Sequence, residues 1–222
     1  MQIKQSIFIL LAGIIGASVV HAVPLQNLDT AKRDIVRYHQ SGQYEYEVSH
    51  ILYSANNYLA ERIEKNKLSK NPKKLAIVLD IDETSLSNYK DLKAMGFGGT
   101  TVEQSLAEGR ADDAAIKPTL ALYNFAKSNN VAVFFITGRK EKYREATEKN
   151  LKAVGYTSWQ KLDLKPNNYS KPSAVDYKQS SRKAIESAGY DIVLNIGDQY
   201  SDLSGGYADR TYKLPNYMYF TR

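Results

Sequence analysis

Along the first third of the chain, apolar residues recur at helical spacing. The pattern between Leu28 and Lys67 predicts two helices, and Ser41-Gly42 breaks the first from the second. Asp29 or Thr30 can cap the first helix. The second helix carries one apolar stripe, made of Val48, Ile51, Leu52, Ala55, Tyr58, Leu59 and Ile63. This stripe predicts a helix with one face packed against a core.

Beyond the polar segment Lys65–Lys74, apolar runs alternate with helical patterns. The runs predict strands at Leu75–Leu79, Val131–Ile136, Lys161–Leu164 and Ile192–Ile196, with a short edge strand at Tyr212–Leu214. Helical patterns lie at Pro118–Lys127, Lys142–Val154 and Lys178–Ala188, and the latter two end at Gly155 and Gly189. Together they predict an α/β fold: a doubly wound, mainly parallel sheet with an N-terminal helical appendage.

The N-terminus has the pattern of a secretory signal. Lys4 precedes an apolar run from Ser6 to Val20, and Val20-His21-Ala22 ends in small residues. The run is short for a membrane span, so cleavage after Ala22 is favoured over an uncleaved anchor. We therefore expect a secreted or periplasmic protein with no stable membrane anchor. The expected organisation is a signal peptide at 1–22, a helical segment at 23–70 and a core domain at 71–222.

Composition supports a globular domain and weakly favours anionic partners. Hydrophobic residues make up 43% of the chain and charged residues 24%, which are ordinary globular values. There is no Cys, which excludes disulfides and a lipid-attached N-terminal cysteine. Without the signal, which holds one Lys and no acid, the net charge falls from +6 to +5. Because the basic residues are scattered, we expect a small anionic substrate rather than a nucleic acid polymer.

Polar clusters follow three of the predicted strands. Asp80, Asp82 and Thr84 follow the first; Thr137, Gly138 and Arg139 follow the second; Gly197, Asp198 and Asp202 lie after the fourth. The carboxyl ends of parallel strands meet at one edge, so these clusters are expected to form one site. Gathered carboxylates repel one another unless a cation intervenes, and oxygen ligands without Cys indicate Mg²⁺.

This pattern suits phosphoryl transfer through a carboxylate. Asp80 can attack phosphorus, while Asp82 protonates the leaving oxygen and then activates water. The Thr137 side chain and the Gly138 amide can hold phosphoryl oxygens, and Lys178 is the candidate fixed cation. The chain lacks the residues on which other phosphatase classes depend. It has no Cys to act as nucleophile, and none of its histidines, His21, His39 and His50, lies in an Arg-His-Gly string.

Four ordered motifs carry a family resemblance. DIDET, FFITGR, YKQSSR and GDQYSDL, followed by KLPN, resemble the haloacid dehalogenase superfamily over about Leu75 to Phe220. The closest likeness is the secreted acid phosphatase branch, which includes bacterial class B and C acid phosphatases and plant vegetative storage proteins.

The resemblance implies a role for each motif residue. Asp80 is expected as nucleophile on a central strand, Asp82 as acid/base, Thr137 as phosphate ligand and Lys178 as phosphate-binding lysine. The implied Mg²⁺ ligands are the Asp80 carboxylate, the Asp82 main-chain oxygen and Asp198, with Asp202, Thr84 and Arg139 in support.

Several alternatives stay open at this level. Lys183 and Lys171 compete with Lys178 as the phosphate-binding lysine. Tyr89 follows the catalytic loop and can either stack on a nucleoside base or belong to the core. The expected activity is broad hydrolysis of phosphomonoesters, with a modest preference for 5′-nucleotides. A phosphotransferase using the same intermediate and a non-catalytic storage or binding protein are the alternatives. The sequence does not decide the oligomeric state, the pH optimum or the preferred ester.

Overall fold

The computed structural model describes residues 26–221, so the predicted signal peptide at 1–22 lies outside the described residues. Its helices are α1 (Leu28–Gln40), α2 (Gln43–Lys67), α3 (Tyr89–Ala94), α4 (Thr101–Arg110), α5 (Lys117–Ser128), α6 (Arg144–Ala153), α7 (Val175–Ser187) and α8 (Tyr200–Leu203), with a 3-10 turn η1 (Glu141–Tyr143). The strands are β1 (Lys74–Leu79), β2 (Leu86–Ser87), β3 (Ala114–Ala115), β4 (Ala132–Lys140), β5 (Lys161–Lys165), β6 (Tyr190–Gly197) and β7 (Arg210–Lys213). Between residues 26 and 221 no helix has both the length and the apolar character to cross a membrane.

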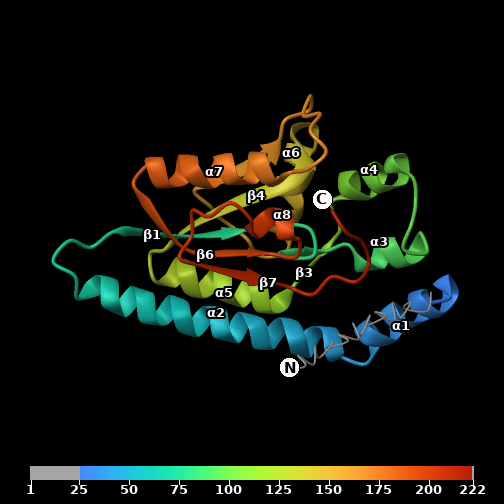
Figure 1. The fold of residues 1–222 in the computed structure, drawn as a ribbon, viewed down its shortest axis with the longest axis horizontal. Helices are drawn as coiled ribbons and strands as arrows, with labels where there is room; N and C mark the ends of the chain where they lie inside the picture. The colour runs from blue at the N-terminus through green and yellow to red at the C-terminus, as the bar shows by residue number, and fades with distance from the viewer. Residues whose placement is uncertain (1–25, 222) are drawn as a thin grey trace, which may run out of the picture.

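A five-stranded parallel sheet forms the centre of the molecule. Its strand order is β5-β4-β1-β6-β7, so β1 lies in the middle, and each neighbouring pair is parallel (Figure 1). A parallel sheet buries both faces, which is why β1 reads as a continuous apolar run. The predicted α/β architecture and the central position of the Asp80 strand are both confirmed.

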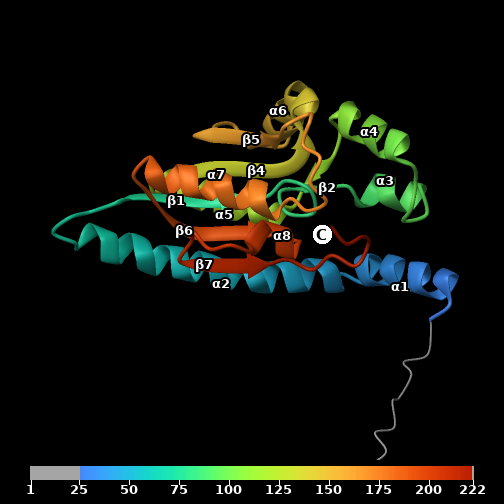
Figure 2. The same cartoon turned by 45° about the horizontal axis from the view of Figure 1, so that its top comes forward.

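Helices cover the two faces of this sheet. Helices α2 and α5 lie along one face and α7 along the other (Figures 1 and 2). The α2 stripe enters the larger core cluster, with Val48, Leu52, Ala55, Leu59 and Ile63 all buried against β1, β4 and β6 residues. Helix α2 is thus a layer of the core, whereas α1 buries no residue fully.

The local boundaries differ in three places from those expected. Helix α1 is capped by Asn27, two residues before the nearer of the two predicted caps, and its side chain accepts hydrogen bonds from the amides of Asp29 and Thr30. Helix α7 begins at Val175, so Lys178 lies inside its first turn. Strand β4 continues to Lys140, which places Thr137 and Arg139 within the strand rather than after it.

The segment between β1 and β4 forms a small unit of its own. It contains the antiparallel pair β2-β3 and the short helices α3 and α4, none of which the periodicity predicted. Figure 1 shows α3 and α4 beyond the carboxyl end of β1. This unit therefore covers the sheet edge at which the polar clusters meet.

Candidate active site

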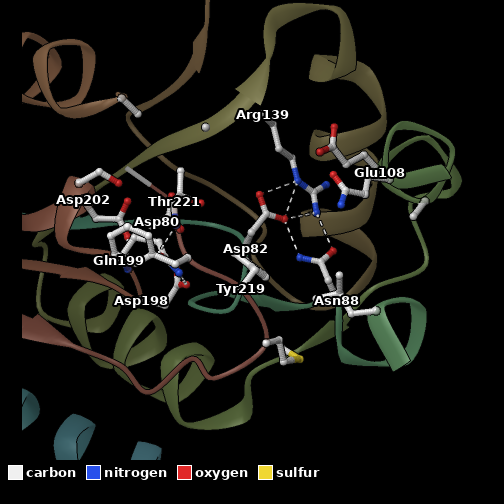
Figure 3. Close-up of a pocket in the computed structure, with 18 of the residues that line it drawn as sticks. Asp80, Asp82, Asn88, Glu108, Arg139, Asp198, Gln199, Asp202, Tyr219 and Thr221 are labelled. Carbon is white, nitrogen blue, oxygen red and sulfur yellow. Dashed lines mark hydrogen bonds and ion pairs between the residues drawn. The ribbon is translucent and has the colours of Figure 1, made fainter. Parts of the chain in front are cut away.

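A cavity of about 520 Å³ opens at the carboxyl ends of β1, β4 and β6 (Figure 3). Its floor comes from the strand ends, one wall from the α3–α4 segment, and another from the C-terminal tail. The ionisable side chains that line it are Asp80, Asp82, Glu108, Arg139, Lys165, Lys178, Asp198, Asp202 and Tyr219. The sequence-predicted Asp80, Asp82, Gly138, Arg139, Lys178, Asp198 and Asp202 are therefore brought together around one space.

Asp80 and Lys178 form a buried ion pair at the centre of the floor. The Lys178 ammonium donates to Asp80 Oδ1 at 2.7 Å and to Asp202 Oδ1 at 2.5 Å. Burial alone would lower the pKa of Lys178, but the two carboxylates raise it above its usual range, so the lysine is charged. Lys183 and Lys171 are exposed, and the latter pairs with Asp176 at the surface. Of the three candidate lysines, only Lys178 lines the cavity.

Asp198 is held by side chains from two other segments. Its Oδ2 accepts from Gln199 Nε2 at 2.5 Å and from Asn216 Nδ2 at 2.7 Å, which leaves Oδ1 with a single long contact from Thr84 at 3.5 Å. Burial and the neighbouring Asp202 raise the pKa of Asp198 to about 6. The free Oδ1 is thus suited to bind a cation.

Glycine is required where Asp202 crosses the end of β6. A Cβ at Gly197 would lie 2.4 Å from the Asp202 Cβ and Oδ2 atoms. Asp202 Oδ2 also accepts from the Gln199 amide at 2.8 Å, which caps the short helix α8. Arg182, fully buried, donates to the main-chain oxygen of Asp202 at 2.6 Å. These contacts fix the Asp202 carboxylate beside Lys178.

The donor set fits a divalent cation. Asp80, Asp198 and Asp202 are all buried, and one oxygen from each lies within 4.8 Å of the others. Lys178 pairs with Asp80 and Asp202, and among the described residues no other cation forms an ion pair with any of the three carboxylates. Burial and the other carboxylates raise the pKa of Asp80, although Lys178 opposes the shift. An uncompensated negative charge surrounded by hard oxygen atoms is the environment that suits Mg²⁺.

Asp82 faces the same cavity but has a different set of partners. Its Oδ1 accepts from Arg139 Nη2 at 2.7 Å, Arg139 Nε at 3.0 Å and Asn88 Nδ2 at 2.8 Å. The fully buried Arg139 also bonds to Asp113 at 3.0 Å. Burial alone would raise the pKa of Asp82, but the charge and hydrogen bonds of Arg139 bring it below its ordinary value. Without metal or substrate, the pKa of Asp80 is thus raised and that of Asp82 is lowered, so the two carboxyl groups have different environments.

The predicted phosphate ligands at the end of β4 differ in access. Gly138 lines the cavity, and a Cβ placed there would meet nothing within 4 Å, so its backbone is open to a ligand. Thr137 is completely buried, and its hydroxyl accepts a hydrogen bond from the Arg139 amide at 3.1 Å. The Thr137 hydroxyl therefore lies beneath the surface of the cavity rather than on it.

Tyr89 does not occupy the position expected of a base-stacking residue. It is absent from the cavity wall, because helix α3 turns its ring toward α1, where it stacks on His39 at 4.0 Å between ring centroids. His39 in turn stacks on Tyr44 at 4.3 Å between ring centroids. The structure therefore places Tyr89 in a packing position, which fits the alternative interpretation of this residue.

Several residues at the site were missed by the sequence analysis. They are Glu83, Asn88, Glu108, Lys165, Arg182, Asn216 and Tyr219. A readable signal existed for three of them: Glu83 lies within DIDET, Arg182 ends the YKQSSR motif and Asn216 ends KLPN, all of which carried the resemblance. The remaining four are scattered single residues that only the tertiary fold brings to the cavity.

Comparison with known proteins identifies the family. The family model described as HAD superfamily, subfamily IIIB (Acid phosphatase), matches residues 16–222. The chain therefore belongs to subfamily IIIB of the HAD superfamily, which confirms the resemblance carried by the four motifs.

Individual relatives are plant proteins. The stem 28 kDa glycoprotein of Glycine max is 41% identical over 151 residues, which cover 64% of this chain and 59% of that protein. Acid phosphatase 1 of Solanum lycopersicum is 36% identical over 149 residues, covering 64% of this chain and 58% of that protein. The chain thus spans about three fifths of the length of these relatives.

A solved structure shares the fold. The class C acid phosphatase from Bacillus anthracis superposes with a TM-score of 0.68 at 23% sequence identity, covering 87% of this chain and 86% of that one. The similarity extends beyond the sheet, since it covers most of both chains. It confirms the haloacid dehalogenase-like fold.

Proposed function

We propose that the protein is a Mg²⁺-dependent acid phosphatase that hydrolyses phosphomonoesters through an aspartyl-phosphate on Asp80. The observation that carries this proposal is the contact between Asp80 and the Lys178 ammonium at 2.7 Å on the floor of a cavity that Asp82 also lines. Membership of an acid phosphatase family supports the same activity. A cavity of about 520 Å³ has room for a small ester rather than a polymer.

The first half-reaction forms the covalent intermediate. An oxygen of Asp80 attacks phosphorus, and the bond between phosphorus and the leaving oxygen breaks. Asp82, protonated in the substrate complex, transfers its proton to that oxygen, so the alcohol leaves uncharged. The pKa of free Asp82 lies below its ordinary value, and a dianionic phosphoryl group beside it would raise that pKa.

The second half-reaction restores the enzyme. Water attacks phosphorus and gives a proton to the Asp82 carboxylate, while the bond from phosphorus to Asp80 breaks and phosphate departs. Lys178 and the Gly138 amide hold the phosphoryl oxygens in both steps. The Thr137 hydroxyl would have to rotate toward the cavity to join them. Mg²⁺, held by the Asp80 and Asp198 carboxylates and the Asp82 main-chain oxygen, would neutralise charge on the phosphoryl group.

The outer wall of the cavity supports a broad range of leaving groups with a modest preference for 5′-nucleotides. Leu92, Met95, Phe97, Met218 and Phe220 line it with apolar surface. An aromatic ring there offers a face for a base, a role that Phe97 can take in place of Tyr89. A comparison of kcat/KM for a nucleoside monophosphate and for glycerol phosphate tests this preference. Phe97→Ala should reduce the ratio of the two values, whereas Tyr89→Ala should leave it unchanged.

Release of phosphate from an aryl phosphate, before and after chelation, tests the activity. We expect turnover with added MgCl₂ that is lost in a verified metal-free sample and returns when Mg²⁺ is restored. Undiminished turnover without metal would overturn the metal requirement. Absence of turnover under all conditions would favour the storage or binding alternative. Added glycerol distinguishes transfer from hydrolysis, because a phosphotransferase would form glycerol phosphate.

Export remains a proposal that concerns residues 1–22. Lys4, the apolar run to Val20 and the small residues at Val20 and Ala22 support cleavage that leaves Val23 as the new N-terminus. N-terminal sequencing of protein recovered outside the cytoplasm tests this. An N-terminus at Met1 would refute cleavage.

A further inference from the structure

Glu83 is a buried carboxyl group within the catalytic loop after β1, and the mechanism above does not use it. It is 0% exposed, and its backbone adopts a left-handed conformation with φ +51. A non-glycine residue in this region is strained by about 1 kcal/mol or more, and such strain persists only where the surroundings impose it. The contacts of the Glu83 side chain show what imposes it here.

Glu83 accepts hydrogen bonds from two other segments. The Asn88 backbone amide donates to Oε1 at 2.7 Å, and the Asn88 side-chain amide donates to Oε2 at 3.1 Å. The Tyr219 hydroxyl, from the C-terminal tail, donates to Oε2 at 2.6 Å. The tail is separated from Glu83 by 136 residues in sequence, so this contact ties the end of the chain to the loop after β1.

Asn88 connects this buried group to the acid/base. Its Nδ2 has two hydrogens, one for Glu83 and one for Asp82 Oδ1 at 2.8 Å. The orientation of its amide is fixed by its neighbours, because Nδ2 faces two carboxylates while Oδ1 faces the Arg139 guanidinium at 3.5 Å. Figure 3 shows Asn88 and Arg139 directed at the same oxygen of Asp82.

The two oxygens of Asp82 are therefore not equivalent. Oδ1 accepts from Asn88 Nδ2 and from two nitrogens of Arg139, whereas Oδ2 has one longer contact, from Arg139 Nε at 3.2 Å. A proton on Oδ1 would meet donor hydrogens that already point at it. The proton of the acid form is thus confined to Oδ2, the oxygen that Asn88 leaves free.

We propose that Asn88, Glu83 and Tyr219 form a positioning unit, the Asp82 anchor, that selects Oδ2 of Asp82 as the oxygen that transfers the proton. Asn88 contacts Asp82, Glu83 sets the orientation of Asn88, and Tyr219 holds Glu83. None of the three touches the reacting atoms through these bonds. This inference rests on the proposed function, because it assigns the anchor to the proton transfers of that reaction.

The effect of the Asp82 anchor on the rate should increase with the need of the leaving group for a proton. An alkyl alcohol leaves poorly without protonation, whereas 4-nitrophenolate leaves readily as an anion. Disturbing the Asp82 anchor should therefore slow hydrolysis of an alkyl phosphate much more than that of 4-nitrophenyl phosphate. A purely structural loss, such as partial unfolding, would lower both rates by the same factor.

The experiment compares kcat/KM for glycerol phosphate and 4-nitrophenyl phosphate in the wild type, Asn88→Ala and Tyr219→Phe. We expect the ratio of the two values to fall about 10-fold in Asn88→Ala and about 3-fold in Tyr219→Phe, as fractions of the effect of a general acid. Asp82→Asn sets the limiting ratio. Tyr217→Phe is the matched control, because Tyr217 is an exposed tyrosine of the same tail, and its ratio should equal that of the wild type.

Each outcome decides one proposal. Equal losses on both esters, or no loss in either variant, would overturn the anchor while the phosphatase activity stands. Absence of turnover of both esters by the wild type would overturn the proposed function and the anchor with it. If Asn88→Ala does not fold, Tyr219→Phe carries the test alone, because it removes a single hydroxyl and keeps the ring in the cavity wall.

Discussion

The ammonium of Lys178 lies 2.7 Å from Oδ1 of Asp80, although the two residues are 98 positions apart in the chain. Helix α7 begins on one face of the sheet and β1 ends at its centre, so the contact exists only when the sheet is assembled. The side chains of both residues are buried, and the lysine also contacts Asp202 at 2.5 Å. This pair joins the nucleophile proposed for the reaction to the cation proposed to hold the phosphate.

Replacing Lys178 by Met should impair both stability and activity. Without the ammonium, Asp80 and Asp202 are buried carboxylates with no cation, and breaking such a pair costs about 3–5 kcal/mol. We expect this loss in urea unfolding with chelator present, and partial recovery with Mg²⁺. The kcat/KM for an aryl phosphate should fall by about 100-fold or more.

Lys183→Met is the matched control for this variant. It removes a lysine from the same helix, but one that is exposed to solvent. Its stability and kcat/KM should stay close to those of the wild type. A Lys178→Met protein as active as Lys183→Met would remove Lys178 from the proposed mechanism.

Gly197→Ala should disturb the acidic cluster by direct overlap. A Cβ at this position would lie 2.4 Å from atoms of Asp202, closer than van der Waals contact permits. Overpacking of this kind costs about 1–3 kcal/mol, and displacing Asp202 should also lower turnover. In Gly109→Ala, in helix α4, the added Cβ meets nothing within 4 Å, so this variant should be as stable as the wild type or slightly more stable. Thermal unfolding of both variants measures the difference. Equal melting temperatures for the two variants would contradict the predicted overlap.

The stability of the fold should decrease in acid through His39. Burial between the rings of Tyr44 and Tyr89 lowers the pKa of His39 from 6.5 to about 4. Below pH 6.5 the unfolded chain binds a proton that the folded protein does not bind, so the free energy of unfolding falls until the pH reaches about 4. Since the ring is only half-buried, the loss should be about 1–2 kcal/mol.

Urea unfolding at pH 7 and pH 4.5 measures this loss in the wild type and in His39→Phe. Phenylalanine keeps an aromatic ring in the stack but does not titrate. The decrease in the free energy of unfolding between the two pH values should be smaller in the variant. Equal decreases would show that other groups account for the acid sensitivity.

The site residues that could be predicted from the sequence are the polar residues at the ends of the predicted strands. Asp80 follows a continuous apolar run and Asp198 follows the predicted strand Ile192–Ile196, and in a parallel sheet that position alone brings them to a common edge. The choice among Lys171, Lys178 and Lys183 needed the structure, because it depends on which face of α7 meets the sheet. The start of helix α4 is readable in the sequence, because Thr100 and Glu103 have the spacing of a capping box and form one in the structure.

The residues around Asp82 could not be predicted in the same way. Asn88 and Tyr219 lie in irregular segments. The contacts of Asn88 with Asp82 and Glu83 depend on the path of the loop after β1, and the contact of Tyr219 with Glu83 joins residues 136 positions apart. Tyr89 is the converse case: it closely follows the catalytic loop in sequence, but that proximity does not determine where its side chain points. The turn at Asn88 starts helix α3, and that helix directs the ring of Tyr89 toward α1.

The most direct test of the mechanism is to trap the covalent intermediate. The protein, loaded with Mg²⁺, is mixed with a phosphomonoester carrying a radiolabelled phosphoryl group, quenched in acid within the first turnover, and digested for peptide mapping. We predict label on the peptide that contains Asp80 and none in Asp80→Asn, which should be folded but inactive. Rapid turnover without label on that peptide, or near-normal turnover by Asp80→Asn, would contradict Asp80 as the nucleophile.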